Sequence, residues 1–427
     1  MDKKIWNTSG VKVSDEISSF LAGEDIELDN SIFIYDIDAT IAHIKGLQSI
    51  NILKKNEFNR LNKSLKELRK KFLEGSFKLT KKYEDCHSAI EFYLTKELGD
   101  LGKKVHTGRS RNDQVLVAMR LFAKNNLHDF KKLNQSIAKI FLQMANKYEY
   151  IPMPGYTHLQ RAMPSSWGLW FSSYAESFID NIDLINSTIE WIDSNPLGSA
   201  AGYGVALPLD RKTTTKELGF KRLQLNSLYT QNSRGKYEMQ VINTLKQSML
   251  DVRKFAWDMS LFMSQEFNLL TIDKAYLTGS SIMPNKHNPD VIEILRANYS
   301  ILAGHASELE NIISLPSGYH RDLQLTKRSL VSSFDISLKS LSILPKLIKS
   351  IKVNKKNSLE YIDNEMKMTD KVYALVNEGT PFRDAYNQVK NSNDLSQFAE
   401  TTRSNYSEGS PGNLKLNVLE KRLSKQR

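Results

Sequence analysis

One loop in the second half of the chain gathers residue types that can bind and stabilise an anion. It reads Gly-Ser-Ser-Ile-Met-Pro-Asn-Lys-His-Asn-Pro over residues 279–289. The Ser280 hydroxyl, the Lys286 cation and the Asn288 amide could hold a carboxylate and stabilise negative charge that develops on it. The same stretch could instead begin a helix, with Asn288 as its N-cap and Glu293 in its first turn. The two interpretations are compatible, because a cap would position the loop.

Two further polar segments offer complementary chemistry. Residues 106–114 hold two arginines within three positions, Arg109 and Arg111, and guanidinium groups suit bidentate carboxylate binding. Residues 154–161 place His158 among Thr, Gln and Arg side chains, where it could transfer protons, although an isolated histidine is more often structural. Neither segment holds a complete catalytic set. Folding or assembly must therefore bring the segments together, and their combined chemistry predicts proton abstraction next to a carboxylate.

Long helices are expected to position these segments. Apolar residues recur at steps of three and four, the spacing of one helix face, within residues 165–189, 242–263, 291–309 and 329–351. Glycine- and proline-rich pieces lie between these stretches, and strand signals are few. The pattern predicts an all-α protein with a long central helix bundle, whose apolar faces could continue into a subunit interface.

The length of the chain predicts more than one structural unit. A chain of 427 residues exceeds what one hydrophobic core usually serves. We expect three helical units: an N-terminal unit over residues 1–108, the central bundle over 109–356, and a small C-terminal unit over 357–427.

Several protein classes are disfavoured by the sequence. No stretch approaches the roughly 18 apolar residues of a membrane span, and no apolar signal segment follows Met1, so a cytoplasmic location without a membrane partner is expected. The single cysteine, Cys86, rules out an intramolecular disulfide, and no Cys/His cluster has zinc-ligand spacing. We therefore expect no metal, and we interpret Cys86 as a packed thiol.

The basic charge of the chain does not indicate nucleic-acid binding. Of the net charge of +11, residues 54–82 contribute +8, with eleven Lys or Arg against three Glu. Leu61, Leu65, Leu68 and Phe72 in this segment share one helix face, so the lysines are expected to form the solvated outer face of an amphipathic helix. The aromatic interleaving of a nucleic-acid surface is missing, and no nucleic-acid partner is expected.

The segments resemble a known superfamily. The loop over residues 279–289 resembles the signature of the fumarase/aspartase superfamily, most of whose members eliminate fumarate from a succinyl-bearing substrate. Other segments resemble the argininosuccinate lyase family in particular: residues 106–115, 154–161, 196–211, 318–324 and 379–383. The resemblance covers nearly the whole chain. It implies an enzyme that splits argininosuccinate into arginine and fumarate without metal or organic cofactor.

The resemblance also implies residue roles. Ser280 would be the base that takes the Cβ proton, and Lys286 would stabilise the resulting aci-carboxylate. His158, oriented by Glu293, would assist the proton delivered to the departing nitrogen. The implied substrate contacts are Arg111, Asn112, Thr157, Asn288, Tyr319, Gln324, Lys327 and, with a weaker match, Arg234. The family assembles each site from three subunits of a homotetramer, so a monomer would be inactive.

The sequence departs from the family pattern at a few positions. Asp25 stands where many members have a substrate-binding serine, and Asn285, His287 and His320 also differ from the common residues. An acidic group at position 25 would either repel a substrate carboxylate or pair with the guanidinium end. Two alternatives remain open: a sister lyase acting on adenylosuccinate or another N-substituted aspartate, and an inactive, crystallin-like structural protein.

Overall fold

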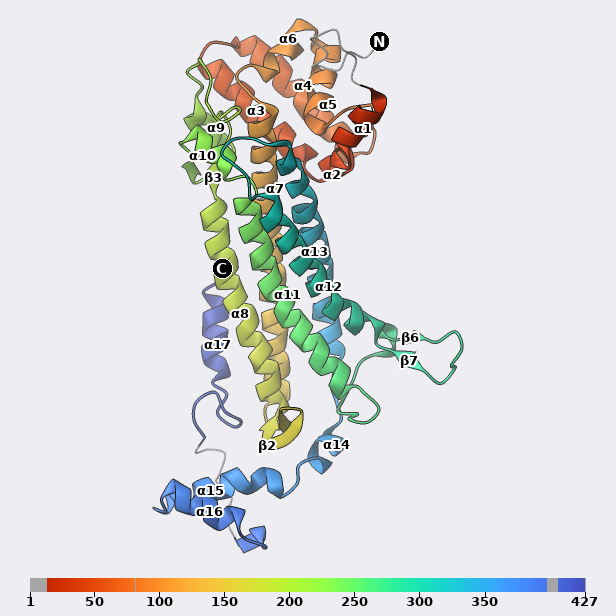
Figure 1. Cartoon of the computed structure of the whole chain (residues 1–427), viewed down its shortest axis with the longest axis vertical. Coiled ribbons are helices and arrows are strands. Elements are labelled where there is room, and N and C mark those ends of the chain that lie inside the picture. The colour runs from red at the N-terminus through yellow and green to blue at the C-terminus, as the bar shows by residue number, and fades with distance from the viewer. Residues whose placement is uncertain (1–13, 81, 398–405, 427) are drawn as a thin grey trace. The chain divides into compact units, whose positions relative to one another are not determined.

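The computed structural model describes residues 14–80, 82–397 and 406–426. Helices dominate this part of the chain, and its strands form only two-stranded sheets (Figure 1). The all-α fold class predicted from the sequence is confirmed. Among the described residues, no helix has the apolar length that crossing a membrane requires.

Five long helices provide the scaffold. They are α7 (Arg111–Lys147), α8 (Trp167–Ile192), α11 (Lys236–Phe262), α12 (Asp290–Ile312) and α13 (Thr326–Ser350). Four of them match the four apolar stretches found in the sequence. The fifth, α7, is the longest, and its first residues belong to the polar segment over residues 106–114.

The chain divides into two compact units, and each long helix contributes residues to both. Unit 1 consists of Met1–His128, Ser187–Asn243 and Gly304–Phe334, and unit 2 of Asp129–Asn186, Thr244–Ala303 and Asp335–Arg427. The predicted boundaries at residues 108 and 356 divide the chain into consecutive segments, whereas each compact unit combines three separate segments. That three-part division stays a prediction.

Unit 1 surrounds its buried aliphatic and aromatic side chains with short and medium helices. These are α1 (Asp15–Ala22), α2 (Asp25–Leu28), α3 (Phe33–Ser49), α4 (Lys55–Leu73), α5 (Cys86–Leu98), α6 (Asp100–Lys103), α9 (Arg211–Glu217) and α10 (Ser227–Asn232), with the strands β3 (Ser194–Asn195) and β4 (Arg222–Leu223). Leu61, Leu65 and Leu68 of α4 are fully buried, so the amphipathic helix predicted for the basic segment is confirmed.

Unit 2 has an aromatic core between its long helices. Phe141 of α7 contacts Phe171 and Phe178 of α8 and Phe255 of α11, with ring centroids 5.4–6.4 Å apart. Such contacts stabilise a core beyond the area they bury. The shorter helices of this unit are α14 (Lys355–Glu360), α15 (Met368–Asn377), α16 (Phe382–Lys390) and α17 (Leu416–Ser424).

The strands of unit 2 shape two of the polar segments. β1 (Pro152–Thr157) pairs antiparallel with β2 (Gln160–Ser166), and β6 (Thr278–Gly279) with β7 (His287–Asn288). β5 (Leu270–Thr271) pairs with β8 (Lys352–Val353). The sequence suggested irregular loops in the first two places, whereas the structure shows that each loop closes a hairpin.

Candidate active site

The loop that carries Ser280 is the tip of the β6–β7 hairpin, which Figure 1 shows projecting from the long helices of unit 2. The Ser280 side-chain oxygen accepts hydrogen bonds from the backbone N–H groups of Met283, at 3.0 Å, and Ile282, at 3.3 Å. Two N–H donors stabilise negative charge on an oxygen. Two backbone N–H groups therefore face the Ser280 oxygen, an arrangement compatible with the base predicted from the sequence.

The hairpin is joined to the start of α12. The Thr278 hydroxyl donates to the Asp290 carboxylate at 2.5 Å, and the Pro289 carbonyl accepts the first helical hydrogen bonds, from Ile292 and Glu293. Pro289 thus occupies the N-cap position, one residue later than predicted. Lys286 lies on the exposed part of the loop, and Asn288 is half-buried.

His158 lies at the two-residue turn of the β1–β2 hairpin. His158 and Leu159 have φ values of 55° and 60°, and Thr157 pairs with Gln160 across the turn. Positive φ at both central residues is typical of a type I′ turn, which glycine and asparagine favour. The turn holds His158 and Thr157 exposed at the tip. Farther along, Arg161 binds Asp363 at 3.0 Å and fixes the hairpin within unit 2.

Glu293 has a different partner from the one expected. Its carboxylate forms an ion pair with Arg296 at 3.8 Å, and its side chain is 55% exposed. Among the described residues, no hydrogen bond or ion pair joins Glu293 to His158. The orienting role of Glu293 stays a prediction, and an exposed carboxylate leaves it available to a second chain.

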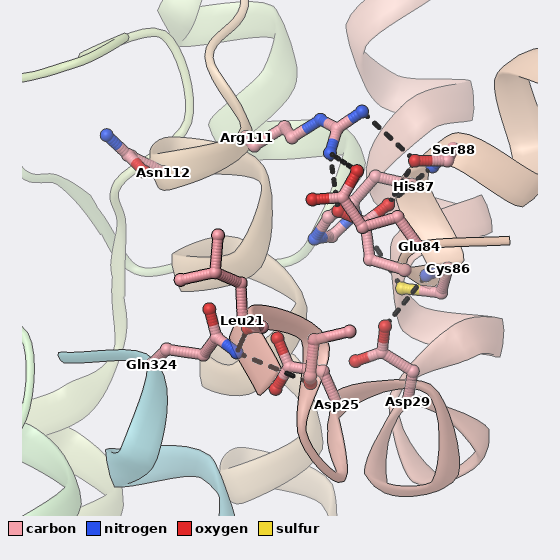
Figure 2. A network of polar contacts seen from close by, with 12 residues as sticks. Leu21, Asp25, Asp29, Glu84, Cys86, His87, Ser88, Arg111, Asn112 and Gln324 are labelled. Carbon is pink, nitrogen blue, oxygen red and sulfur yellow. Dashed lines mark hydrogen bonds and ion pairs between the residues drawn. The ribbon is translucent and has the colours of Figure 1, made fainter. Parts of the chain in front are cut away.

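Arg111, the first residue of α7, is held by the start of α5 in unit 1 (Figure 2). Its guanidinium binds Asp85 at 2.9 Å, Glu84 at 3.4 Å and the Ser88 hydroxyl at 3.0 Å. Asp85 also caps α5 by accepting from the Ser88 N–H at 2.7 Å. Burial acts to raise the pKa of Asp85, but the charges of His87 and Arg111 outweigh it, and the pKa is lowered. Arg111 is therefore presented in one orientation by an ionised carboxylate.

Lys327 is a buried cation that two carboxylates share. Its ammonium group lies 2.5 Å from Asp29 and 3.1 Å from Asp25, and its side chain is 3% exposed. Burial acts to lower the pKa of Lys327, but the charges of Asp29 and Asp25 raise it overall. Asp25, singled out in the sequence, therefore neutralises Lys327 together with Asp29. Sequence reasoning missed Asp29, although its position four residues after Asp25 was a usable signal for a shared helical face.

The remaining predicted contacts also belong to unit 1. Gln324 donates to the Leu21 carbonyl at 2.9 Å, which ties the segment before α13 to the N-terminal helices. Arg234 is 6% exposed and lies over the Tyr319 ring, 5.6 Å from its centroid. Burial lowers the pKa of Arg234. The Asn112 side chain is half-buried and points away from the Arg111 guanidinium in Figure 2.

The structure sorts the predicted site residues into two sets. Unit 2 holds Ser280, His158, Lys286, Glu293, Thr157 and Asn288, and unit 1 holds Arg111, Asn112, Tyr319, Gln324, Lys327 and Arg234. The first set contains the groups expected to move protons. The second contains most groups expected to bind carboxylates.

A half-buried histidine near Arg111, His106, predicts acid sensitivity of unit 1. Burial, with the charges of Arg109 and Arg111, lowers the pKa of His106 to about 4. An unfolded histidine has a pKa of about 6.5, so the unfolded chain binds the proton first and stability should fall as pH drops from 6.5 towards 4. His106→Gln should abolish that loss, on the order of 1–3 kcal/mol. Urea midpoints of both proteins at pH 7 and 4.5 measure it, and equal acid losses in the two would contradict the assignment.

Comparison with known proteins gives a consistent result. A family model described as "Lyase" matches residues 18–302. The argininosuccinate lyase of Xanthomonas oryzae pv. oryzae (strain PXO99A) is 47% identical over 423 residues, covering 98% of each chain. That of Xylella fastidiosa (strain Temecula1 / ATCC 700964) is 48% identical over 386 residues, covering 90% of this chain and 87% of the relative.

Solved structures share the fold at lower identity. EDDS lyase in complex with formate superposes with a TM-score of 0.81 at 21% identity, covering 98% of this chain and 92% of the other. Class II fumarase from Schistosoma mansoni gives a TM-score of 0.73 at 16% identity, covering 89% and 93%.

Proposed function

The chain belongs to the argininosuccinate lyase family of the fumarase/aspartase superfamily, and we propose that it eliminates fumarate from argininosuccinate to release arginine. The observation that carries this function is 47% identity to an argininosuccinate lyase over 98% of both chains. The site residues are a separate proposal. It is supported by the local geometry of the two sets.

Ser280 is the proposed base. Its alkoxide takes the Cβ proton of the succinyl group, and the electron pair left behind passes into the adjacent carboxylate to give an aci-carboxylate. The N–H groups of Ile282 and Met283 that bind Ser280 lower the cost of placing negative charge on its oxygen. Lys286, six residues along the same loop, is the cation proposed to stabilise the aci-carboxylate.

The second half of the reaction breaks the C–N bond. The electron pair of the aci-carboxylate forms the double bond of fumarate, and the departing guanidino nitrogen receives a proton. His158 is proposed to assist that transfer, oriented by Glu293. The turn at the tip of β1–β2 leaves the imidazole of His158 exposed, and a proton donor must be accessible to the substrate.

Arg111 is the proposed clamp for a substrate carboxylate, and Asp85 is a positioning residue that acts through it. Asp85→Asn should keep the cap of α5, because an asparagine oxygen also accepts from the Ser88 N–H, while removing the charge that faces Arg111. We expect KM for argininosuccinate to rise about tenfold with kcat little changed. Steady-state kinetics measure this split. Asp100→Asn, an exposed control, should leave both constants unchanged, and an unaltered KM in Asp85→Asn would refute the role.

The active form is proposed to be a homotetramer with sites shared between subunits. Several large apolar side chains of the long helices are exposed in unit 2: Trp257, Ile294, Ile301 and Ile343. Exposed apolar side chains on bundle helices are suited to an interface with further copies. The division of the predicted residues into two sets also suits a site completed by other chains.

Shared sites make a testable prediction. Ser280→Ala and Arg111→Ala should each be inactive alone, but mixed tetramers of the two should regain activity at sites that take both intact residues from different chains. The two proteins would be dissociated, mixed, reassembled and assayed, with each variant treated alone as the control. Light scattering would measure the size of each assembly. A mixture as inactive as its components would argue for sites built within one chain.

Fumarate release tests the proposed function itself. Purified protein would be given argininosuccinate and, in parallel, adenylosuccinate, and the ultraviolet absorbance of fumarate followed. Release from argininosuccinate alone is expected. Release from adenylosuccinate alone would keep the chemistry and change the substrate, and release from neither would favour the structural-protein alternative.

A further inference from the structure

Three side chains of different chemistry meet in the interior of unit 1, apart from the proposed catalytic groups. Asp36 of α3 lies against Cys86 and His87, the first two residues of α5, and the three are at most 7% exposed. The His87 Nδ1 atom is 2.7 Å from an Asp36 oxygen, and the Cys86 sulfur is 3.5 Å from the same oxygen and 3.7 Å from His87 Nδ1. Figure 2 shows Cys86 and His87 in this network, with Asp29 bound to the Cys86 N–H.

These separations are close to those of a tetrahedral metal site. Zinc binds thiolate sulfur at about 2.3 Å and imidazole nitrogen or carboxylate oxygen at about 2.0–2.2 Å, so two ligand atoms at a tetrahedral angle lie about 3.3–3.6 Å apart. The two sulfur separations already match that range closely. Only the nitrogen–oxygen pair, now joined by a hydrogen bond, would have to widen, by about 0.6 Å.

We propose that Asp36, Cys86 and His87 form a binding site for one thiophilic divalent cation such as Zn²⁺. The set of one sulfur, one nitrogen and one oxygen suits zinc or cobalt and is a poor match for Mg²⁺ or Ca²⁺, which prefer all-oxygen sites. The site is separate from the proposed lyase reaction, and the inference does not depend on that function.

A carboxylate already faces the other two groups in this interior. One Asp36 oxygen lies 2.7 Å from His87 Nδ1 and 3.5 Å from the Cys86 sulfur, so an anionic ligand is in place before any ion binds. The thiol and the imidazole would supply the other two ligand atoms by losing the protons at those positions, and metal binding in proteins is commonly coupled to such proton release.

A neighbouring amide could complete the coordination. Gln114 of α7 donates to the other Asp36 oxygen at 2.9 Å and is 2% exposed. Within the part of the chain that the structure describes, its side-chain oxygen is buried without a hydrogen-bond partner. That oxygen could bind the metal or accept a hydrogen bond from a metal-bound water.

The sequence could not have indicated this site. Adjacent cysteine and histidine residues lack the spacing of a zinc motif, and Asp36 lies 50 residues from Cys86. Folding alone brings them together. A bound ion would join α3 to the start of α5, beside the Asp85 and Ser88 groups that hold Arg111.

The single cysteine makes the test unambiguous. Full-length protein freed of metal would be incubated with Co²⁺ for hours, because the buried site admits an ion only through local opening. We expect one Co²⁺ per chain with a near-ultraviolet thiolate-to-cobalt band, loss of that band on adding Zn²⁺, and no band in Cys86→Val. His106→Gln, a control in the same region that retains all three ligands, should keep the band. A wild-type protein that shows no thiolate band, or equal metal content in Cys86→Val, would overturn the proposal.

A second measurement covers the case in which Cys86→Val does not fold. Zn²⁺ should slow the reaction of the wild-type thiol with a thiol reagent at least tenfold, whereas Mg²⁺ should not, because a thiolate bound to zinc is not free to react when the site opens locally. Equal rates with and without Zn²⁺ would also overturn the proposal.

Discussion

Ser280→Ala should lower kcat for argininosuccinate by a factor on the order of 10²–10⁴, the usual contribution of a positioned general base. The variant lacks the oxygen that accepts from Ile282 and Met283, so the proposed base for the Cβ proton is absent. KM should change little, because the proposed carboxylate contacts, Arg111 above all, are retained. Initial-rate kinetics from fumarate absorbance measure both constants.

The neighbouring hydroxyl provides the matched control. Ser281 is exposed on the same loop and accepts none of the hydrogen bonds found for Ser280, so Ser281→Ala should remain active. Light scattering must show the same assembly for both variants. Near-normal turnover in Ser280→Ala, with assembly intact, would remove Ser280 as the base and leave Lys286 or His158 to be tested in its place.

Helices with a continuous apolar face were predictable from the sequence. The stretches over residues 165–189 and 242–263 became α8 and α11 because spacing of three and four residues leaves one face to bury. The longest helix, α7, was not recognised from the sequence. Its first turn contains Asp113 and Gln114, whose polar side chains are buried in specific contacts. Asp113 accepts from the N–H groups of Gly198 and Ala200, and such distant partners cannot be inferred from local pattern.

The candidate site was predictable in residue type and less so in local geometry. Glycine, serine and lysine in the 279–289 loop indicated anion chemistry, but not that the Ser280 oxygen would be an acceptor of backbone hydrogen bonds. Likewise, the tight turn at His158 and Leu159 could not be predicted. Both residues have positive φ, which usually occurs at glycine or asparagine, and neither residue type is present there to indicate such a turn. The geometry of both loops follows from the pairing of β1 with β2 and of β6 with β7, which local sequence does not reveal.

The partners of Lys327 were the least accessible to sequence reasoning. Lys327 and Asp29 lie 298 residues apart, yet they form one of the most buried ion pairs in the described structure. Position 25 alone suggested either repulsion of a substrate carboxylate or pairing with the guanidinium end of the substrate. In the structure, Asp25 instead pairs with Lys327, which belongs to the same unit. This ion pair explains how an acidic residue is tolerated at position 25.

Lys327→Met should lower the free energy of unfolding by about 3–5 kcal/mol, the range for removing one partner of a buried ion pair. Methionine would fill most of the volume but remove the cation that the fully buried Asp29 carboxylate and Asp25 both contact. Thermal and urea unfolding of the assembled protein measure the loss. Lys339→Met is the matched control, because that lysine pairs with Asp335 at the surface and should contribute less than about 1 kcal/mol.

The pH dependence separates the charge effect from lost packing. Burial already raises the pKa of Asp25 above its ordinary value while the charge of Lys327 acts to lower it, so removing the lysine should raise that pKa further. The destabilisation is then largest at neutral pH and shrinks as pH falls through the raised pKa of Asp25. Adding Asp29→Asn to Lys327→Met should likewise restore part of the stability, since the two sites are in contact. If the loss of unfolding free energy is the same at pH 7 and pH 5, and is not reduced in the double variant, then packing rather than charge explains the need for Lys327.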